Sequence, residues 1–245
     1  MSLDPHVSDP IADLARFGEP LVFAGPSVEG LPQWMRRKIQ LRPPARRGDL
    51  EALRAQRQPG RVVLLDGLFG ASMAVTPTEC RQLLEDGWQV VGASSIGALR
   101  ASELWSVGMI GVGEIYTMLR MDIVTADAEL AVAYHPDTHR ELTYSLVHVR
   151  AAVASVADTP AMAELAPTLL HAAQAIYWPE RSRARLQRAW TRQGLSEHQL
   201  ARLLGRLADP ELHPKHKDAR LAVQCALASD WVLYHDPCTS EQRAS

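Results

Sequence analysis

The chain has 245 residues and a formal net charge of −2 at pH 7, with 22% charged and 47% hydrophobic residues. This balance is ordinary for a soluble globular protein and indicates neither nucleic acid nor a membrane surface as a partner. No apolar run approaches the roughly 20 residues that a membrane-spanning helix needs. The polar start of the chain does not resemble a signal peptide. The three cysteines, Cys80, Cys225 and Cys238, lack C-x-x-C spacing and favour reduced thiols in the cytoplasm.

The first half of the chain alternates predicted strands with predicted helices. Residues 1–19 are expected to be a peripheral N-terminal segment. Apolar runs predict buried strands at 21–24, 61–65 and 88–91, and a further strand is expected at 129–134. A helix should begin at Thr76, because Thr76, Pro77 and Glu79 form a capping-box pattern, and it should end at Gly87. Strands that alternate with helices predict a parallel sheet.

From about residue 147 the pattern changes to Ala-rich and Leu-rich stretches with helical spacing. The sequence therefore predicts an α/β fold in which residues 20–145 form a mainly parallel, Rossmann-like sheet flanked by helices. Residues 146–238 are expected to form a helical region packed on this core, and residues 239–245 a flexible tail. The strands at 62–65 and 89–91 should be neighbours in the centre of the sheet.

The most informative motif is the strand-to-helix turn that begins at Gly92. A hydrophobic strand passes through small residues directly into a predicted helix, which is what a sharp turn requires, since bulky side chains would collide with the adjacent backbone. The pattern Ala93-x-Ser95-x-Gly97 resembles the nucleophile elbow G-x-S-x-G with its first glycine replaced by Ala. We therefore expect Ser95 to be the first candidate nucleophile, and Ser94, which more often would shape the turn, to be the second. Direct attack by water, oriented by Asp66 or a histidine, is the alternative.

The start of the elbow helix should also attract an anion, because its first N–H groups are unpaired and lie at the positive end of the helix dipole. The expected oxyanion donors are Gly67, Leu68, Ile96 and Gly97. Both segments follow the carboxyl ends of strands, where ligands bind in open α/β sheets. In the structural alternative, the serines only cap the helix. A phosphate cradle is a third interpretation, although G-x-G-x-x-G and a Walker lysine are absent.

A serine nucleophile needs a base, and no histidine lies close to the elbow in sequence. The candidates are Asp66, His135, His139 and His148. His135 would follow the predicted 129–134 strand and lie at the same edge of the sheet as the elbow, although a structural role is more common for such a histidine.

Charged side chains supply two further candidate groups. Arg100 and Glu103 are three residues apart on the elbow helix and either form a surface ion pair or leave Arg100 to bind a carboxylate or thiocarboxylate. Four arginines at helical spacing form either a solvated basic face or a docking surface for an acidic protein. They are Arg181, Arg185, Arg188 and Arg192.

Two histidine pairs have metal-like spacing, His135 with His139 and His213 with His216. A proline interrupts the helix that would bring each pair of rings together, and no cysteine or carboxylate set accompanies them. Neither a metal site nor a cofactor is expected.

Several segments, in this order, resemble the core of the TfuA-like family. They are residues 22–27, 43–49, 64–69, 91–101 with Glu103 and Leu104, and 108–113. The resemblance covers roughly residues 20–150, and the C-terminal half is similar only loosely, for instance at Lys217-Asp218-Ala219. One departure is the start of the helix after the Asp-Gly loop, which reads His-Lys-Glu in the family and Pro77-Thr78-Glu79 here.

The resemblance implies a partner of a YcaO-type enzyme, which activates a peptide amide with ATP so that sulfide can replace its oxygen. It implies a role in peptide backbone thioamidation, with sulfide released by hydrolysis of a thiocarboxylated ThiS-like sulfur carrier protein. The precursor peptide is a further candidate partner; nucleic acid and membrane are not. The competing hypotheses are a non-catalytic adaptor that binds YcaO and the carrier, and a nucleotide-binding regulator.

Overall fold

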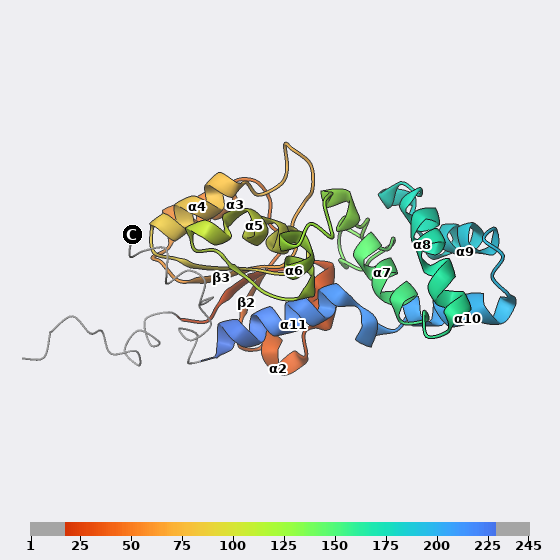
Figure 1. Ribbon diagram of the computed structural model, residues 1–245. Helices are drawn as coiled ribbons and strands as arrows, with labels where there is room; N and C mark the ends of the chain where they lie inside the picture. Colours follow the sequence, from red (N-terminus) through yellow and green to blue (C-terminus); the bar gives the residue numbers. More distant parts are fainter. Residues whose placement is uncertain (1–17, 229–245) are drawn as a thin grey trace, which may run out of the picture.

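The computed structural model of the protein describes residues 18–228 (Figure 1). The predicted tail and Cys238 lie outside these residues, as does nearly all of the predicted N-terminal segment. Five parallel strands form one sheet in the order β2-β1-β3-β4-β5. The strands are β1 (Leu21–Phe23), β2 (Gln40–Arg42), β3 (Arg61–Leu64), β4 (Gln89–Gly92) and β5 (Ile110–Gly111). The protein is therefore an α/β protein with an all-parallel sheet, as the sequence predicts.

The predicted central pair of strands is confirmed, since β3 and β4 are parallel neighbours with Val62 opposite Val90 and Leu64 opposite Gly92. The predicted strand at 129–134 is wrong. Residues 127–129 form a short 3-10 helix, η3 (Asp127–Glu129), and Tyr134 makes only an isolated antiparallel bridge with Glu141. The apolar residues in this segment are buried for another reason: Leu130 packs among helices, and its carbonyl accepts a hydrogen bond from the Lys215 ammonium at 2.6 Å.

Helices cover both faces of the sheet, as Figure 1 shows. One face packs against α3 (Asp49–Gln56), α4 (Pro77–Glu85) and α5 (Ile96–Leu104). The other packs against η1 (Pro26–Gly30), α2 (Gln33–Arg36) and α11 (Pro214–Leu227). Two short elements, η2 (Trp105–Val107) and α6 (Glu114–Arg120), flank β5 in the chain. The predicted start of α4 is confirmed, because the Thr76 hydroxyl and the Glu79 carboxylate form the reciprocal capping box.

The remaining helices form a lobe beside the sheet (Figure 1). They are α7 (Leu146–Ala154), α8 (Pro160–Gln174), η4 (Trp178–Glu180), α9 (Arg183–Thr191), α10 (Glu197–Leu207) and η5 (Pro210–Leu212). The lobe has its own apolar core around Trp190, which is fully buried and donates its indole N–H to the Leu169 carbonyl at 3.0 Å. The chain then returns to the sheet, where Ala222 and Val223 of α11 pack in one core with Val63 of β3 and Val91 of β4.

Candidate functional site

The elbow between β4 and α5 requires small residues at two positions. A Cβ atom on Gly92 would lie 2.0 Å from the Gly97 carbonyl oxygen, and one on Gly97 would lie 1.8 Å from the Leu64 carbonyl oxygen. The sharpest backbone conformation occurs at Ser94, whose φ is 70°. A residue with a side chain is strained in this left-handed region, and such strain is typical of functional turns, including the nucleophile elbow. The strained serine of the elbow is thus Ser94 and not Ser95.

A buried hydrogen-bond network surrounds the Ser94 hydroxyl. Its Oγ lies 2.5 Å from Ser27 Oγ, and Ser27 donates its hydroxyl proton to Asp66 Oδ1 at 2.8 Å. Asp66 Oδ2 accepts the Gly25 and Ser27 backbone N–H groups, both at 2.8 Å. Since Ser27 has only one hydroxyl proton, the Ser94 hydroxyl is left to donate either to Ser27 Oγ or to the Lys215 carbonyl at 3.1 Å. The serines and the carboxylate form a relay, Ser94 to Ser27 to Asp66.

Lys215 belongs to the first turn of α11, and this turn also holds two stacked histidines. The rings of His213, the N-cap of α11, and His216 are 3.7 Å apart between centroids and inclined by only 6°. The ring of His148, on α7, lies 4.0 Å from that of His213, and His213 Nε2 is 3.2 Å from Glu141 Oε2. Four side chains from a loop, α7 and α11 therefore form one cluster.

The prediction that a proline would keep His213 and His216 apart is wrong. Pro214 occupies the first position of α11, where it suits the helix, and His213 precedes it as the N-cap. The two histidines therefore lie on the same short turn. The missing carboxylate is supplied by Glu141, which is remote in sequence.

The three clustered imidazoles are held in their neutral form. Burial lowers the pKa of His148 to about 3, with a smaller contribution from His213. Burial likewise lowers the pKa of His213 to about 3, assisted by the Lys215 ammonium, and the pKa of His216 to about 4. Neutral imidazoles carry a free lone pair, so each can bind a cation.

A cavity of about 350 Å³ gives this cluster access to solvent. It lies between the sheet and the helical lobe, and its walls include Glu29 of η1, Tyr144, His148, His213 and His216. Ligand pockets are frequently found between such units. The Ser94 relay lies directly behind the wall, because the Lys215 carbonyl that contacts Ser94 belongs to the residue before His216.

Residues 66–182 match the profile of a family described as TfuA-like protein. Over this segment, the chain is similar to the TfuA-like family. No curated protein of known function is similar enough to the chain to be matched. The matched segment includes Asp66, Ser94, Glu141 and His148, whereas Ser27 and His213 lie outside it and reach the site only through the fold.

The predicted anion donors of the elbow differ in availability. The Leu68 N–H donates to the Ala45 carbonyl at 3.0 Å, and the Gly97 N–H is directed at the Leu65 carbonyl at 3.5 Å. Gly67 and Ile96 are the remaining two candidates. Ser95 is the N-cap of α5, but its side chain caps no backbone N–H, and it is 3% exposed. Of the two elbow serines, Ser94 is therefore the one whose hydroxyl makes hydrogen bonds.

His135 lies in an irregular loop, because the strand expected before it is absent. Its side chain is 46% exposed, and its Nδ1 accepts the backbone N–H of Asp137 at 3.3 Å. The predicted position of His135, at the carboxyl end of a strand, is therefore wrong. For Arg100, the structure shows the ion pair and not a free guanidinium. Arg100 pairs with Glu103 and donates to the Val75 carbonyl at 2.9 Å.

The predicted arginine stripe is wrong at its first member. Arg181 precedes α9 and is buried, and its guanidinium donates to the carbonyls of Ala173, Tyr144 and Ile176. Arg181 therefore ties the helical lobe together from within. The other three, Arg185, Arg188 and Arg192, are exposed, and Arg185 pairs with Glu180 at 3.4 Å.

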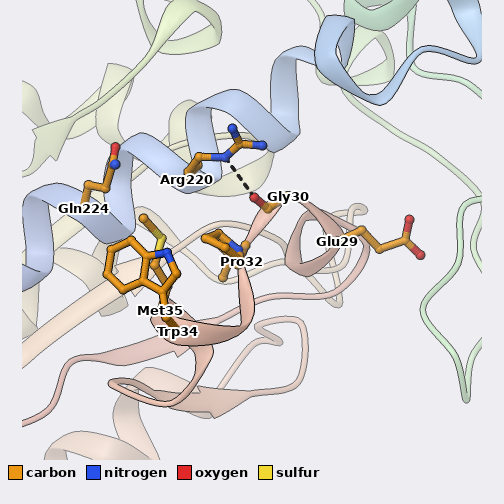
Figure 2. A pocket seen from close by; sticks show the side chains of 8 residues that line it. Glu29, Gly30, Pro32, Trp34, Met35, Arg220 and Gln224 are labelled. Atoms are coloured by element: carbon orange, nitrogen blue, oxygen red, sulfur yellow. Dashed lines mark hydrogen bonds between the residues drawn. The ribbon is translucent and has the colours of Figure 1, made fainter.

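A second cavity, of about 380 Å³, lies where η1 and α2 meet α11 (Figure 2). Trp34 on its wall is 53% exposed, and Arg220 donates to the Gly30 carbonyl at 3.2 Å. Figure 2 shows the Glu29 carboxylate pointing away from Trp34. Glu29 also lines the histidine cavity, so η1 separates the two hollows. Among residues 18–228, no helix has the length and apolar character that crossing a membrane requires.

Proposed function

We propose that this TfuA-like protein supports YcaO-dependent peptide backbone thioamidation by hydrolysing the C-terminal thiocarboxylate of a ThiS-like sulfur carrier, which releases sulfide. The observation that carries the proposal is the strained Ser94, whose hydroxyl is linked through Ser27 to the buried Asp66 carboxylate. An activated serine, a proton acceptor and nearby backbone N–H groups are the parts that acyl transfer needs.

The relay gives each proton a destination. Ser94 Oγ attacks the thiocarboxylate carbon while its proton passes to Ser27 Oγ, and the Ser27 proton passes to Asp66. The carbon–sulfur bond then breaks, and the relayed proton leaves with the sulfur as HS⁻. The products of this half-reaction are HS⁻ and an ester between the carrier and Ser94. Water then hydrolyses the ester: one of its protons returns to Ser94, and the other is released to solvent as the carrier is left with a carboxylate. Gly67 and Ile96 are the proposed N–H donors to the oxyanion.

Access to Ser94 depends on the first turn of α11. Ser94 is 0% exposed, and the Lys215 carbonyl covers its hydroxyl at 3.1 Å. The proposal therefore requires this turn to lift when the carrier tail enters from the histidine cavity. Closure of an active site by a packed segment also excludes bulk water, which strengthens the electrostatic interactions inside it.

The same burial favours a second candidate function, a non-catalytic adaptor that binds YcaO and the carrier. In that role the Ser94–Ser27–Asp66 network only fixes the elbow against η1 and α11. The exposed arginines Arg185, Arg188 and Arg192 would then contribute to docking an acidic partner.

Paired serine variants distinguish the two functions. Purified protein is incubated with thiocarboxylated carrier, and sulfide and the intact mass of the carrier are followed over time. Ser94→Ala should slow sulfide release by about 1,000-fold or more, as loss of a nucleophile does. Ser95→Ala, the matched control at the same elbow, should stay within about 10-fold of the wild type, because a residue that only shapes the site affects the rate weakly.

Two results would contradict the assignment of Ser94 as the nucleophile. If Ser94→Ala releases sulfide at the wild-type rate and Ser95→Ala does not, the assignment from the sequence pattern is correct and the relay is structural. If the wild-type protein releases no sulfide, yet thioamidation by YcaO still depends on it, the adaptor is the function.

A further inference from the structure

The histidine cluster contains polar atoms that the fold leaves without partners. Among residues 18–228, Glu141 Oε1, both ring nitrogens of His148 and His213 Nδ1 are buried and have no hydrogen-bond partner. His148 as a whole is 2% exposed. Buried polar atoms in native proteins nearly always have a partner, so a group of such atoms at one place indicates that something else binds there.

We propose that Glu141, His148 and His213 bind a divalent transition-metal ion such as zinc. Each of the three offers one ligand atom, and these atoms all lie within 4.8 Å of one another. Two imidazoles and one carboxylate form the donor set of open zinc sites, which hold the ion with three protein ligands and leave a fourth position for water or substrate.

The distances are compatible with a tetrahedral ion after small side-chain rotations. Ligand atoms at about 2.0–2.1 Å from zinc are about 3.3 Å from one another in tetrahedral geometry. His213 Nε2 and Glu141 Oε2 are already 3.2 Å apart. His148, whose ring nitrogens have no hydrogen-bond partner among the described residues, can rotate to complete the set.

The ligand types of the cluster favour a transition-metal ion over Mg²⁺ and Ca²⁺. Mg²⁺ and Ca²⁺ prefer oxygen ligands, of which the three side chains offer only the Glu141 carboxylate. The Lys215 ammonium, whose charge lowers the pKa of His213, donates to the Leu130 carbonyl at 2.6 Å. His216 stacks on His213 and holds its ring in position. The cluster lines the cavity of about 350 Å³, so the ion and a fourth ligand can enter from solvent.

This site does not depend on the proposed hydrolase activity, because its test measures bound metal and not sulfide. The full-length protein, without a histidine tag, is dialysed against a chelator and titrated with Zn²⁺ or Co²⁺. Bound metal is measured by elemental analysis, and Co²⁺ by its visible absorption. We expect one equivalent of zinc and the intense Co²⁺ bands of a tetrahedral site.

Three ligand variants and one control locate the ion. His148→Ala, His213→Ala and Glu141→Gln should each weaken zinc binding by at least about 10- to 100-fold, the loss already seen when only the supporting partners of ligands are removed. Glu141→Gln keeps the shape of the side chain, so the test holds even if a histidine variant fails to fold. His171→Ala, at an exposed position of α8, should bind zinc as the wild type does. Folded wild-type protein that binds no zinc, or equal binding by all three ligand variants, would overturn the proposal.

Discussion

Replacing Asp66 by Asn tests whether the buried relay carries a proton or only fixes the turn. The carboxylate accepts three hydrogen bonds, from the backbone N–H groups of Gly25 and Ser27 and from the Ser27 hydroxyl. In Asp66→Asn, the amide oxygen can accept both backbone N–H groups. The amide nitrogen must then face Ser27 Oγ as a donor, which reverses the direction of the third bond.

The cost in stability follows from these three bonds. A hydrogen bond to a charged group contributes about 1.5–3 kcal/mol and a neutral one about 0.5–1.5 kcal/mol, so each bond loses about 1 kcal/mol. Asp66→Asn should therefore lower the free energy of unfolding by about 2–3 kcal/mol and leave the protein folded. Urea unfolding followed by circular dichroism measures this change, with an unaltered m-value as the sign that only stability has shifted.

The cost in rate should be larger, because an amide cannot accept the relayed proton. Loss of a general base typically slows the chemical step by about 100- to 10,000-fold. The assay is single-turnover release of sulfide from thiocarboxylated carrier. Ser27→Ala is the matched control, since it interrupts the same relay while Asp66 keeps its bond to the Gly25 N–H. Sulfide release within threefold of the wild type in folded Asp66→Asn would refute the relay.

Two further predictions concern the fold. Gly97→Ala should destabilise the protein by about 4 kcal/mol or more, because its Cβ would lie 1.8 Å from the Leu64 carbonyl oxygen. Gly205→Ala, where a Cβ meets nothing within 4 Å, should instead raise the free energy of unfolding by about 0.5–1 kcal/mol. Equal urea midpoints for the two would contradict the packing of the elbow. Arg181→Gln should cost about 3 kcal/mol because three buried carbonyls lose their donor, whereas Arg188→Ala, on the exposed face, should change stability by less than about 0.5 kcal/mol. If the two variants unfold at the same urea concentration, Arg181 does not hold the lobe together.

The sequence by itself determined the features that depend on neighbours along the chain. Apolar runs predicted β1, β3 and β4, and their alternation with helices predicted a parallel sheet. The Thr76–Glu79 capping box begins α4 where it was expected. Gly92 and Gly97 were correctly predicted as positions that need small residues. Local sterics and hydrogen bonds within a few residues decide most of these features, whereas Gly97 must be small because it packs against the Leu64 carbonyl of the neighbouring strand.

Only the tertiary structure decided which polar groups meet. Ser27 lies 39 residues from Asp66 and 67 from Ser94, and α11 crosses the sheet to bring Lys215 over the elbow, 121 residues away. The same crossing brings His213 to Glu141 and His148. The 129–134 segment shows the converse: its apolar pattern indicated a strand, yet it is buried against helices. An apolar pattern indicates that a segment is buried. Which surface covers the segment, and which side chains that surface contributes, depends on how distant parts of the chain pack together.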